Sequence, residues 1–223
     1  MDGKMIIHIQ SDTHTEMGPA IGQACTSDVT ICAGDNGTFV KPDSLARYFD
    51  QIREYCNEIV FVLGNHEFYH GDYEETLTKA DKFAKKHGIH LLDEVYGTQD
   101  LVLNGITFWG STLWTDMKDG DYLVKQKIGN GFSDYHVITD GDLRFSCQKT
   151  IDINTRTREK INWDADIIIT HHCPIVIEHR RFPVNDITYG FCNTGLEEQL
   201  AASKAKFWVY GHTHDSRCID ING

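Results

Sequence analysis

The sequence predicts an α/β fold in which two β-sheets pack face to face and helices cover the outside. Short apolar runs rich in β-branched and aromatic residues are typical of buried strands. Five such runs occur, at residues 5–9, 29–32, 59–63, 167–169 and 207–210. A second observation is that helical apolar spacing follows some of these runs. A third is the pair Asn104-Gly105 between two apolar runs, the strongest short-range signal for a hairpin, which indicates that a second, antiparallel sheet begins there.

Four helices are predicted from periodicity and from residues suited to helix ends. The first begins at Pro42. Its apolar positions are Leu45, Tyr48, Phe49, Ile52, Tyr55 and Cys56. The second begins at Asp72 and stops near Gly88, where the pattern ends. A third is expected over 147–161 and a short fourth from Thr194 to about residue 202.

The stretch 115–145 fits neither the helical nor the strand period, and it holds four glycines among charged and aromatic residues. It predicts long loops over the mouth of a site. Candidates for substrate contact there are Trp114, Asp134, Tyr135 and His136. For the aromatic residues, packing of the loop onto the body of the protein is an equally good interpretation.

Length and composition favour one domain over residues 1–223, because no linker, low-complexity run or repeat interrupts the 223 residues. Lys+Arg 21 against Asp+Glu 33 gives a net charge of −12, which repels a phosphate backbone and argues against nucleic acid as a partner. Seven cysteines without a C-x-x-C pair indicate reduced thiols and a cytoplasmic protein. No signal peptide or membrane-spanning run is predicted, so no membrane partner is expected.

Each of the five strand-like runs is followed at once by side chains that can bind a metal ion. The clusters are Asp12-Thr13-His14, Gly34-Asp35-Asn36, Gly64-Asn65-His66-Glu67, His171-His172-Cys173-Pro174 and Gly211-His212-Thr213-His214. In open α/β sheets, ligands bind just beyond the carboxyl ends of strands, so these five ends can converge on one crevice. A single histidine after a strand is usually structural. Five clusters in this order indicate one metal site.

The candidate ligands are Asp12, His14, Asp35, Asn65, His171, His212 and His214. Mixed oxygen and imidazole donors suit Mn, Fe, Zn, Ni or Co better than calcium. Seven ligands exceed what one tetrahedral ion needs, so we expect two divalent ions sharing a bridging carboxylate, with manganese favoured. Paired metals about 3.5–4 Å apart are a common device for displacement at phosphorus.

The order of these motifs, from Asp12 to His214, resembles the calcineurin-like metallophosphoesterases. The chain is most similar to small phosphoesterases of bacteria and phages. That similarity lies in residues 11–16, 64–69, 110–116, 132–135 and 211–215. The resemblance implies a four-layer αββα sandwich with two mixed β-sheets flanked by helices.

The resemblance also implies roles for individual residues. Asp12, His14, Asp35 and His214 would hold the first ion. Asp35, Asn65, His171 and His212 would hold the second, with Asp35 bridging. His66 would lie beside the scissile phosphate as proton donor or electrostatic clamp, and His172 would support the ligands or contact substrate.

The expected reaction is metal-assisted hydrolysis of a small phosphorylated substrate such as a nucleotide. A hydroxide bridging the ions would attack phosphorus in line, while the metals and Asn65 hold the non-bridging oxygens and His66 meets the leaving oxygen. Arg180 and Arg181 could grip a substrate phosphate or carboxylate. A solvated loop face is an equal alternative for this arginine pair.

Two departures from the family pattern affect the expected activity. Phosphoprotein phosphatases carry Asp-Arg-Gly shortly after Gly-Asp, whereas this chain has Asp35-Asn36-Gly37-Thr38, which argues against protein phosphatase activity. Thr38 also stands where several relatives have the aspartate that orients the histidine equivalent to His66. How far His66 can act as an acid is therefore open.

The sequence leaves two alternative functions, and it argues against one alternative mechanism. A nuclease or phosphodiesterase acting on nucleic acid should show basic patches with interleaved aromatic residues, for which only Arg180-Arg181 qualifies. A non-catalytic scaffold should have lost ligands, whereas every ligand position is intact. A cysteine nucleophile at Cys173 lacks a phosphate-cradling loop.

Residues 217–221 resemble a strand entering the hairpin signal Asn222-Gly223 without a partner strand, so we expect either a truncated chain or an unpaired edge strand.

Overall fold

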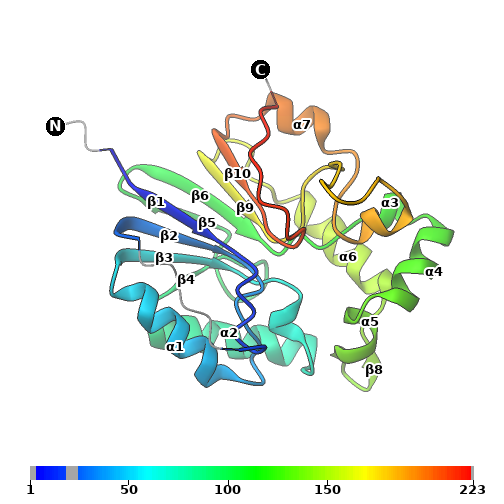
Figure 1. Cartoon of the computed structure of the whole chain (residues 1–223), viewed down its shortest axis with the longest axis horizontal. Helices are drawn as coiled ribbons and strands as arrows, with labels where there is room; N and C mark the ends of the chain where they lie inside the picture. The colour runs from blue at the N-terminus through cyan, green and yellow to red at the C-terminus, as the bar shows by residue number, and fades with distance from the viewer. Residues whose placement is uncertain (1–3, 19–24, 222–223) are drawn as a thin grey trace.

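The computed structural model describes residues 4–18 and 25–221, and it contains two four-stranded sheets (Figure 1). In the first sheet the strand order is β1-β2-β3-β4 and every pairing is parallel. Its strands are β1 (Ile7–Gln10), β2 (Ser27–Ala33), β3 (Cys56–Val62) and β4 (His90–Leu91). The predicted two-sheet α/β fold is confirmed. The first sheet is parallel in the part described, so only the second sheet is mixed.

The second sheet has the order β10-β9-β6-β5, in which only the β5–β6 pair is antiparallel. Its strands are β5 (Asp100–Leu103), β6 (Ile106–Ser111), β9 (Ile167–Thr170) and β10 (Phe207–Val209). The predicted hairpin joins β5 to β6. Asn104 and Gly105 have φ of 50° and 82°, which is the left-handed pair that a two-residue type I′ turn requires.

Alternation along the strands explains why the layers form. In β2 and β3, Val29, Ile31 and Val60 face the second sheet in one buried cluster, whereas Cys32 and Phe61 face the helices on the other side. Successive side chains of a strand point to opposite faces, so both faces of the first sheet are covered. The second sheet buries its outer face against residues that flank α6 and α7, as the predicted four-layer arrangement requires.

The four predicted helices form, with shifts at their ends. They are α1 (Pro42–Arg53), α2 (Tyr73–His87), α6 (Cys147–Arg158) and α7 (Glu197–Ala202). The Asp72 side chain accepts a hydrogen bond from the Glu75 backbone, and Gly88 closes α2 in the left-handed conformation. Tyr55 lies beyond α1 and Cys56 begins β3, so the prediction that the first helix includes these two residues is wrong.

The expectation of long loops over 115–145 is wrong. The segment folds into α3 (Met117–Gly120), α4 (Tyr122–Gly131), α5 (Asp134–Val137) and a small hairpin of β7 (Thr139–Asp140) and β8 (Leu143–Arg144). Val124 and Ile128, one helical turn apart, bury in the same core as Trp114 and Phe145. The aromatic residues therefore pack the segment onto the body.

The C-terminal part differs from the expectation as well. No strand forms over 217–221, and residues 222 and 223, which carry the hairpin signal, lie outside the described residues. Two short 3₁₀ helices complete the structure, η1 (His66–Phe68) and η2 (Asp186–Gly190). Nowhere in the described ranges is a helix sufficiently long and apolar to traverse a bilayer.

Candidate metal centre

The loops that follow the strands are joined to one another, and this brings the candidate ligands together. The backbone N–H of Asp12 donates to Gly34 (3.0 Å), so the loop after β1 runs beside the loop after β2. The N–H of Gly211 donates to His171 (3.0 Å), which joins the loops after β10 and β9. The N–H of His212 donates to the Asp12 carboxylate (2.9 Å) and connects the two sheets.

One group of candidate ligands consists of Asp12, His14 and His214. Their ligand atoms all lie within 4.8 Å of one another. The Nε2 atoms of His14 and His214 are 3.2 Å apart, and His214 Nε2 is 3.3 Å from Asp12 Oδ1. Neighbouring carboxylates raise the pKa of His14 against the opposing effect of burial, and Asp12 raises that of His214. Three of the four residues expected at the first ion are therefore together, and the fourth, Asp35, belongs to the second group.

A second, buried group consists of Asp35, His171 and His212, again within 4.8 Å of one another. His171 Nε2 lies 3.2 Å from Asp35 Oδ2 and 3.1 Å from Asn65 Oδ1. His171 Nδ1–H donates to the carbonyl of Ala33 (2.8 Å), which leaves Nε2 free to face the group. Together with Asn65, this group makes up the four residues expected at the second ion.

The donor chemistry of both groups fits divalent ions. His212 Nε2 is buried without a hydrogen-bond partner among the described residues. Although burial opposes it, Asp35 raises the pKa of His171 to about 10, whereas burial and the two neighbouring histidines lower that of His212. The lowered pKa keeps His212 neutral, and its buried Nε2 meets no hydrogen-bond partner in the described part of the chain. Cations would satisfy these atoms together with the carboxylates.

Five candidate ligands adopt left-handed backbone conformations, which is costly for residues other than glycine. The φ values are 55° for Asp12, 45° for His14, 53° for Asp35, 65° for His212 and 50° for His214. Such residues cost on the order of 1–3 kcal/mol each and cluster at functional sites. In the described residues, five of the twelve non-glycine residues with positive φ are candidate ligands, and a second run of such residues lies between Leu113 and Asp119.

Glu67 holds the loops after β2 and β3 together. Its carboxylate accepts backbone N–H groups from Asp35 (2.9 Å), Asn36 (2.7 Å), Gly37 (3.2 Å) and Gly64 (2.6 Å). The sequence placed Glu67 within a ligand cluster but assigned it no role. Satisfying four donors at once fixes the position of Asp35.

Gly64 leaves no room for a side chain beside Asp35. A Cβ at Gly64 would lie 2.5 Å from the Asp35 backbone nitrogen and 2.8 Å from the His171 ring. Gly64→Ala is therefore expected to lower the free energy of unfolding by about 1–3 kcal/mol, as overpacking typically does, and to weaken metal binding. Denaturant unfolding and metal titration check both effects. Gly131→Ala is the control, because a Cβ added at Gly131 would meet nothing within 4 Å. Equal losses of stability and metal binding in the two variants would contradict the prediction.

His66 is held on two sides. Its Nδ1–H donates to Glu16 Oε1 (2.8 Å), and its ring stacks on Tyr69 with centroids 4.1 Å apart. Its Nε2 lies 3.9 Å from Asp35 Oδ2. Sequence reasoning missed Glu16, although it continues the alternation Asp12-x-His14-x-Glu16. No hydrogen bond from Thr38 to His66 occurs among the described residues.

Asn65 is supported by the segment that was expected to be a loop. Its Nδ2–H donates to the Tyr69 hydroxyl (3.2 Å), and the Asn65 side chain lowers the pKa of the neighbouring Asp134 carboxyl against the larger effect of burial. Asp134 is buried, which raises its pKa to about 6. The sequence proposed Asp134 as a substrate contact at the mouth. It lies instead behind a candidate ligand.

The candidates for substrate contact are spread over different environments. His172 is buried and its Nδ1–H donates to the Thr112 carbonyl (3.3 Å); burial and His171 lower its pKa to about 3. It is thus a neutral support behind His212. His136 is exposed and hydrogen-bonds Asn130 and Arg144 instead of any candidate ligand.

Of the two neighbouring arginines, Arg180 forms an ion pair and Arg181 does not in the described structure. Arg180 Nε lies 3.1 Å from Oδ1 of Asp215, the residue that follows His214 in the chain. Arg217, which the sequence did not single out, reaches the other oxygen of Asp215 at 2.9 Å. Arg181 is exposed, and within the described structure its only hydrogen bond is from its backbone N–H to His179 (3.0 Å).

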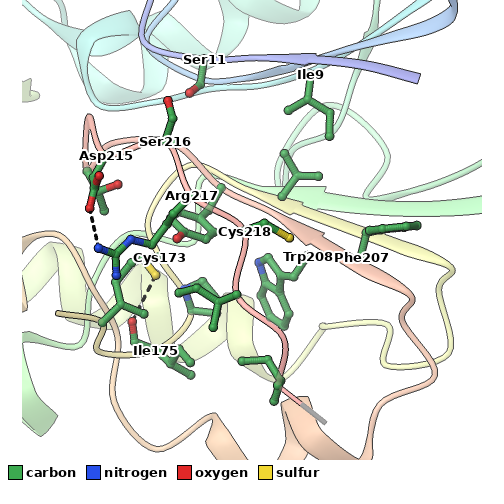
Figure 2. A pocket seen from close by; sticks show the side chains of 18 of the residues that line it. Ile9, Ser11, Cys173, Ile175, Phe207, Trp208, Asp215, Ser216, Arg217 and Cys218 are labelled. Atoms are coloured by element: carbon green, nitrogen blue, oxygen red, sulfur yellow. Dashed lines mark hydrogen bonds and ion pairs between the residues drawn. The ribbon is translucent and has the colours of Figure 1, made fainter. Parts of the chain in front are cut away.

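A cavity of about 1100 Å³ lies between the ends of β1 and β10 and reaches Asp12 and His214. Figure 2 shows Ile9 and Ser11 on one side, Phe207 and Trp208 on another, and Arg217 and Cys218 on the C-terminal segment that crosses it. The cavity adjoins the first ligand group. Asp35, His171 and His212 do not line it.

Comparison with known proteins agrees with this geometry. The sequence profile described as Calcineurin-like phosphoesterase matches residues 7–216. An uncharacterized protein of Acanthamoeba polyphaga mimivirus is 26% identical over 208 residues, covering 81% of this chain and 70% of that protein. The crystal structure of a phosphopantetheinyl hydrolase from Mycobacterium tuberculosis has a TM-score of 0.67 at 16% identity, covering 95% of this chain and 84% of that one. The chain therefore belongs to the calcineurin-like phosphoesterase family and is a metal-dependent phosphoric ester hydrolase.

Proposed function

We propose that the protein hydrolyses a small phosphorylated substrate, such as a nucleotide, with two divalent metal ions held by the seven candidate ligands. The observation that supports this most directly is the pair of ligand groups, each with a carboxylate and two imidazoles within 4.8 Å. When bound, the ions would supply Lewis-acid activation of water and of the phosphoryl oxygens. Manganese is the first candidate among the metals that such mixed oxygen and imidazole donors suit.

The protein's own residues would position the substrate and handle the leaving group. Asp35 accepts the backbone N–H of His66 through Oδ1 (2.8 Å) and presents Oδ2 to His171, so it is suited to lie between the two ions. His66 directs Nε2 to the side of Asp35, where an imidazolium with hydrogen on both nitrogens could give its Nε2 proton to a leaving oxygen and keep hydrogen on Nδ1. Arg181, with an unpaired guanidinium, is the better candidate of the two arginines for an anionic group of the substrate.

The net charge of −12 supports a small substrate over a polynucleotide. The structural neighbour is named for a phosphopantetheinyl group, so such an ester belongs among the compounds to test. We also propose a cytoplasmic location, as the reduced cysteines suggest: all seven are free in the structure.

The test is a hydrolysis screen with and without metal. Mono-, di- and cyclic nucleotides, a phosphopantetheinyl ester and bis-p-nitrophenyl phosphate are incubated with the protein in Mn, and again with a chelator. We expect hydrolysis of at least one small ester in Mn, its loss with chelator, and its return when Mn is restored. Hydrolysis that survives complete removal of metal would refute the proposal, as would inactivity of fully metal-loaded protein on every ester.

A further inference from the structure

We propose that Glu16 is the positioning residue for His66 and that the same carboxylate oxygen also orients His14. This inference rests on the proposed function of the site. Glu16 Oε1 accepts hydrogen bonds from His66 Nδ1 (2.8 Å) and from His14 Nδ1 (3.2 Å). The two rings meet edge to face, with centroids 4.3 Å apart. One acidic side chain thus connects the candidate acid with a candidate metal ligand.

The contact defines which nitrogen of each ring carries hydrogen. An ionised carboxylate only accepts hydrogen bonds, so Nδ1 must be the donor on both histidines. Nε2 of His14 is then free to face His214, and Nε2 of His66 is turned to the side of Asp35. An acceptor on one nitrogen commonly sets the tautomer and orientation of a working histidine.

Glu16 supplies what the sequence at Thr38 lacks. The orienting aspartate of several relatives is absent, yet His66 has a carboxylate partner that arrives from the loop after β1. Tyr69 stacks on the face of the same ring while Glu16 holds its edge. Together they restrict both tilt and rotation of the imidazole.

The backbone around Glu16 is fixed by other contacts, so its side chain can be removed without releasing the loop. Thr15 hydrogen-bonds Asn36 through its backbone (3.1 Å) and its hydroxyl (2.8 Å). The N–H of Met17 donates to the carbonyl of His14 (2.9 Å). Lys41 donates to the backbone carbonyl of Glu16 (3.1 Å).

The kinetic test is a double-mutant cycle of Glu16→Ala and His66→Ala on an alkyl phosphoester at saturating metal. Glu16→Ala is expected to lower kcat/KM about 10–100-fold, as loss of a supporting partner commonly does. In the His66→Ala background the same change should cost clearly less, because the ring it positions is gone. Fully additive losses would overturn the inference.

Glu58→Ala is the matched control. Glu58 Oε2 also lies 2.8 Å from a histidine, His90 Nε2, but this pair joins β3 to β4 away from the ligands. Its removal should leave kcat/KM unchanged. An equal loss in Glu58→Ala would show that any broken Glu–His pair impairs the protein, and would overturn the specific role of Glu16.

A second readout needs neither metal nor activity. Nitrogen-15 NMR of the metal-free protein reports the tautomer of each neutral histidine, and the His66→Ala spectrum assigns the signal. We expect His66 to carry hydrogen on Nδ1 in the wild type, and to lose this preference in Glu16→Ala. Hydrogen on Nε2 in the wild type would overturn the inference even if Glu16→Ala did not fold. This readout does not depend on turnover. Inactivity in the hydrolysis screen would therefore refute the proposed function, while the NMR measurement would still test whether Glu16 positions His66.

Discussion

Asp35→Ala is expected to abolish binding of both metal ions and to reduce hydrolysis to the level of chelated protein. Asp35 is almost completely buried, so water cannot easily take the place of its carboxylate. Its charge acts on His171 and His212 in its own group and on His14 and His214 in the other. Removal therefore leaves both groups of imidazoles without a shared anion. Metal content by mass spectrometry and kcat/KM on the best ester measure the two effects.

Asp12→Ala is the comparison for Asp35→Ala. Asp12 belongs to the first ligand group only, with His214 Nε2 3.3 Å from its carboxylate. This variant should mainly weaken one ion and retain the other. The bridging assignment would be wrong if Asp35→Ala kept one tightly bound ion, and the dinuclear proposal would fail if active, well-loaded wild-type protein held at most one ion per chain.

The parts of the fold that the sequence predicted are those with a local chemical cause. Asn104-Gly105 forms the hairpin because both residues tolerate positive φ, and α2 runs from the cap at Asp72 to the left-handed Gly88. The segment 115–145 was misinterpreted because its helices are short and are stabilised by tertiary contacts. Val124 and Ile128 span one turn, which is too little for periodicity to detect, yet both are buried against distant residues.

The candidate site shows the same division between local pattern and long-range contact. Ligand types directly after strands could be recognised, because strand ends on one side of a sheet must lie together. Glu16 could not be recognised in this way, since its partner His66 is fifty positions away and an orienting carboxylate has no motif of its own. His172 was recognised from its motif, but its role was not. Only the structure shows that it is buried behind His212.

His66→Ala is expected to lower kcat/KM on an alkyl phosphoester by roughly 10²–10⁴-fold, the range over which a positioned acid acts. The loss should be clearly smaller on a p-nitrophenyl ester, because that leaving group hardly needs a proton. Metal content should not change, since the His66 side chain belongs to neither of the two ligand groups assigned to the ions. The contact with Glu16 strengthens this expectation, because the carboxylate holds the Nδ1–H of the imidazolium form, so that the Nε2–H is the proton offered to the leaving oxygen.

Two measurements separate the roles that His66 could have. A ratio of alkyl to p-nitrophenyl rates that falls in His66→Ala identifies proton donation, because only the alkyl ester depends on an acid. Equal losses on both esters would make His66 an electrostatic clamp on the phosphoryl group, contrary to the prediction. The variant must also retain its ions when analysed. His14, Glu16 and His66 have ligand atoms within 4.8 Å of one another, so a loss of metal in His66→Ala would show that the ring binds an ion directly.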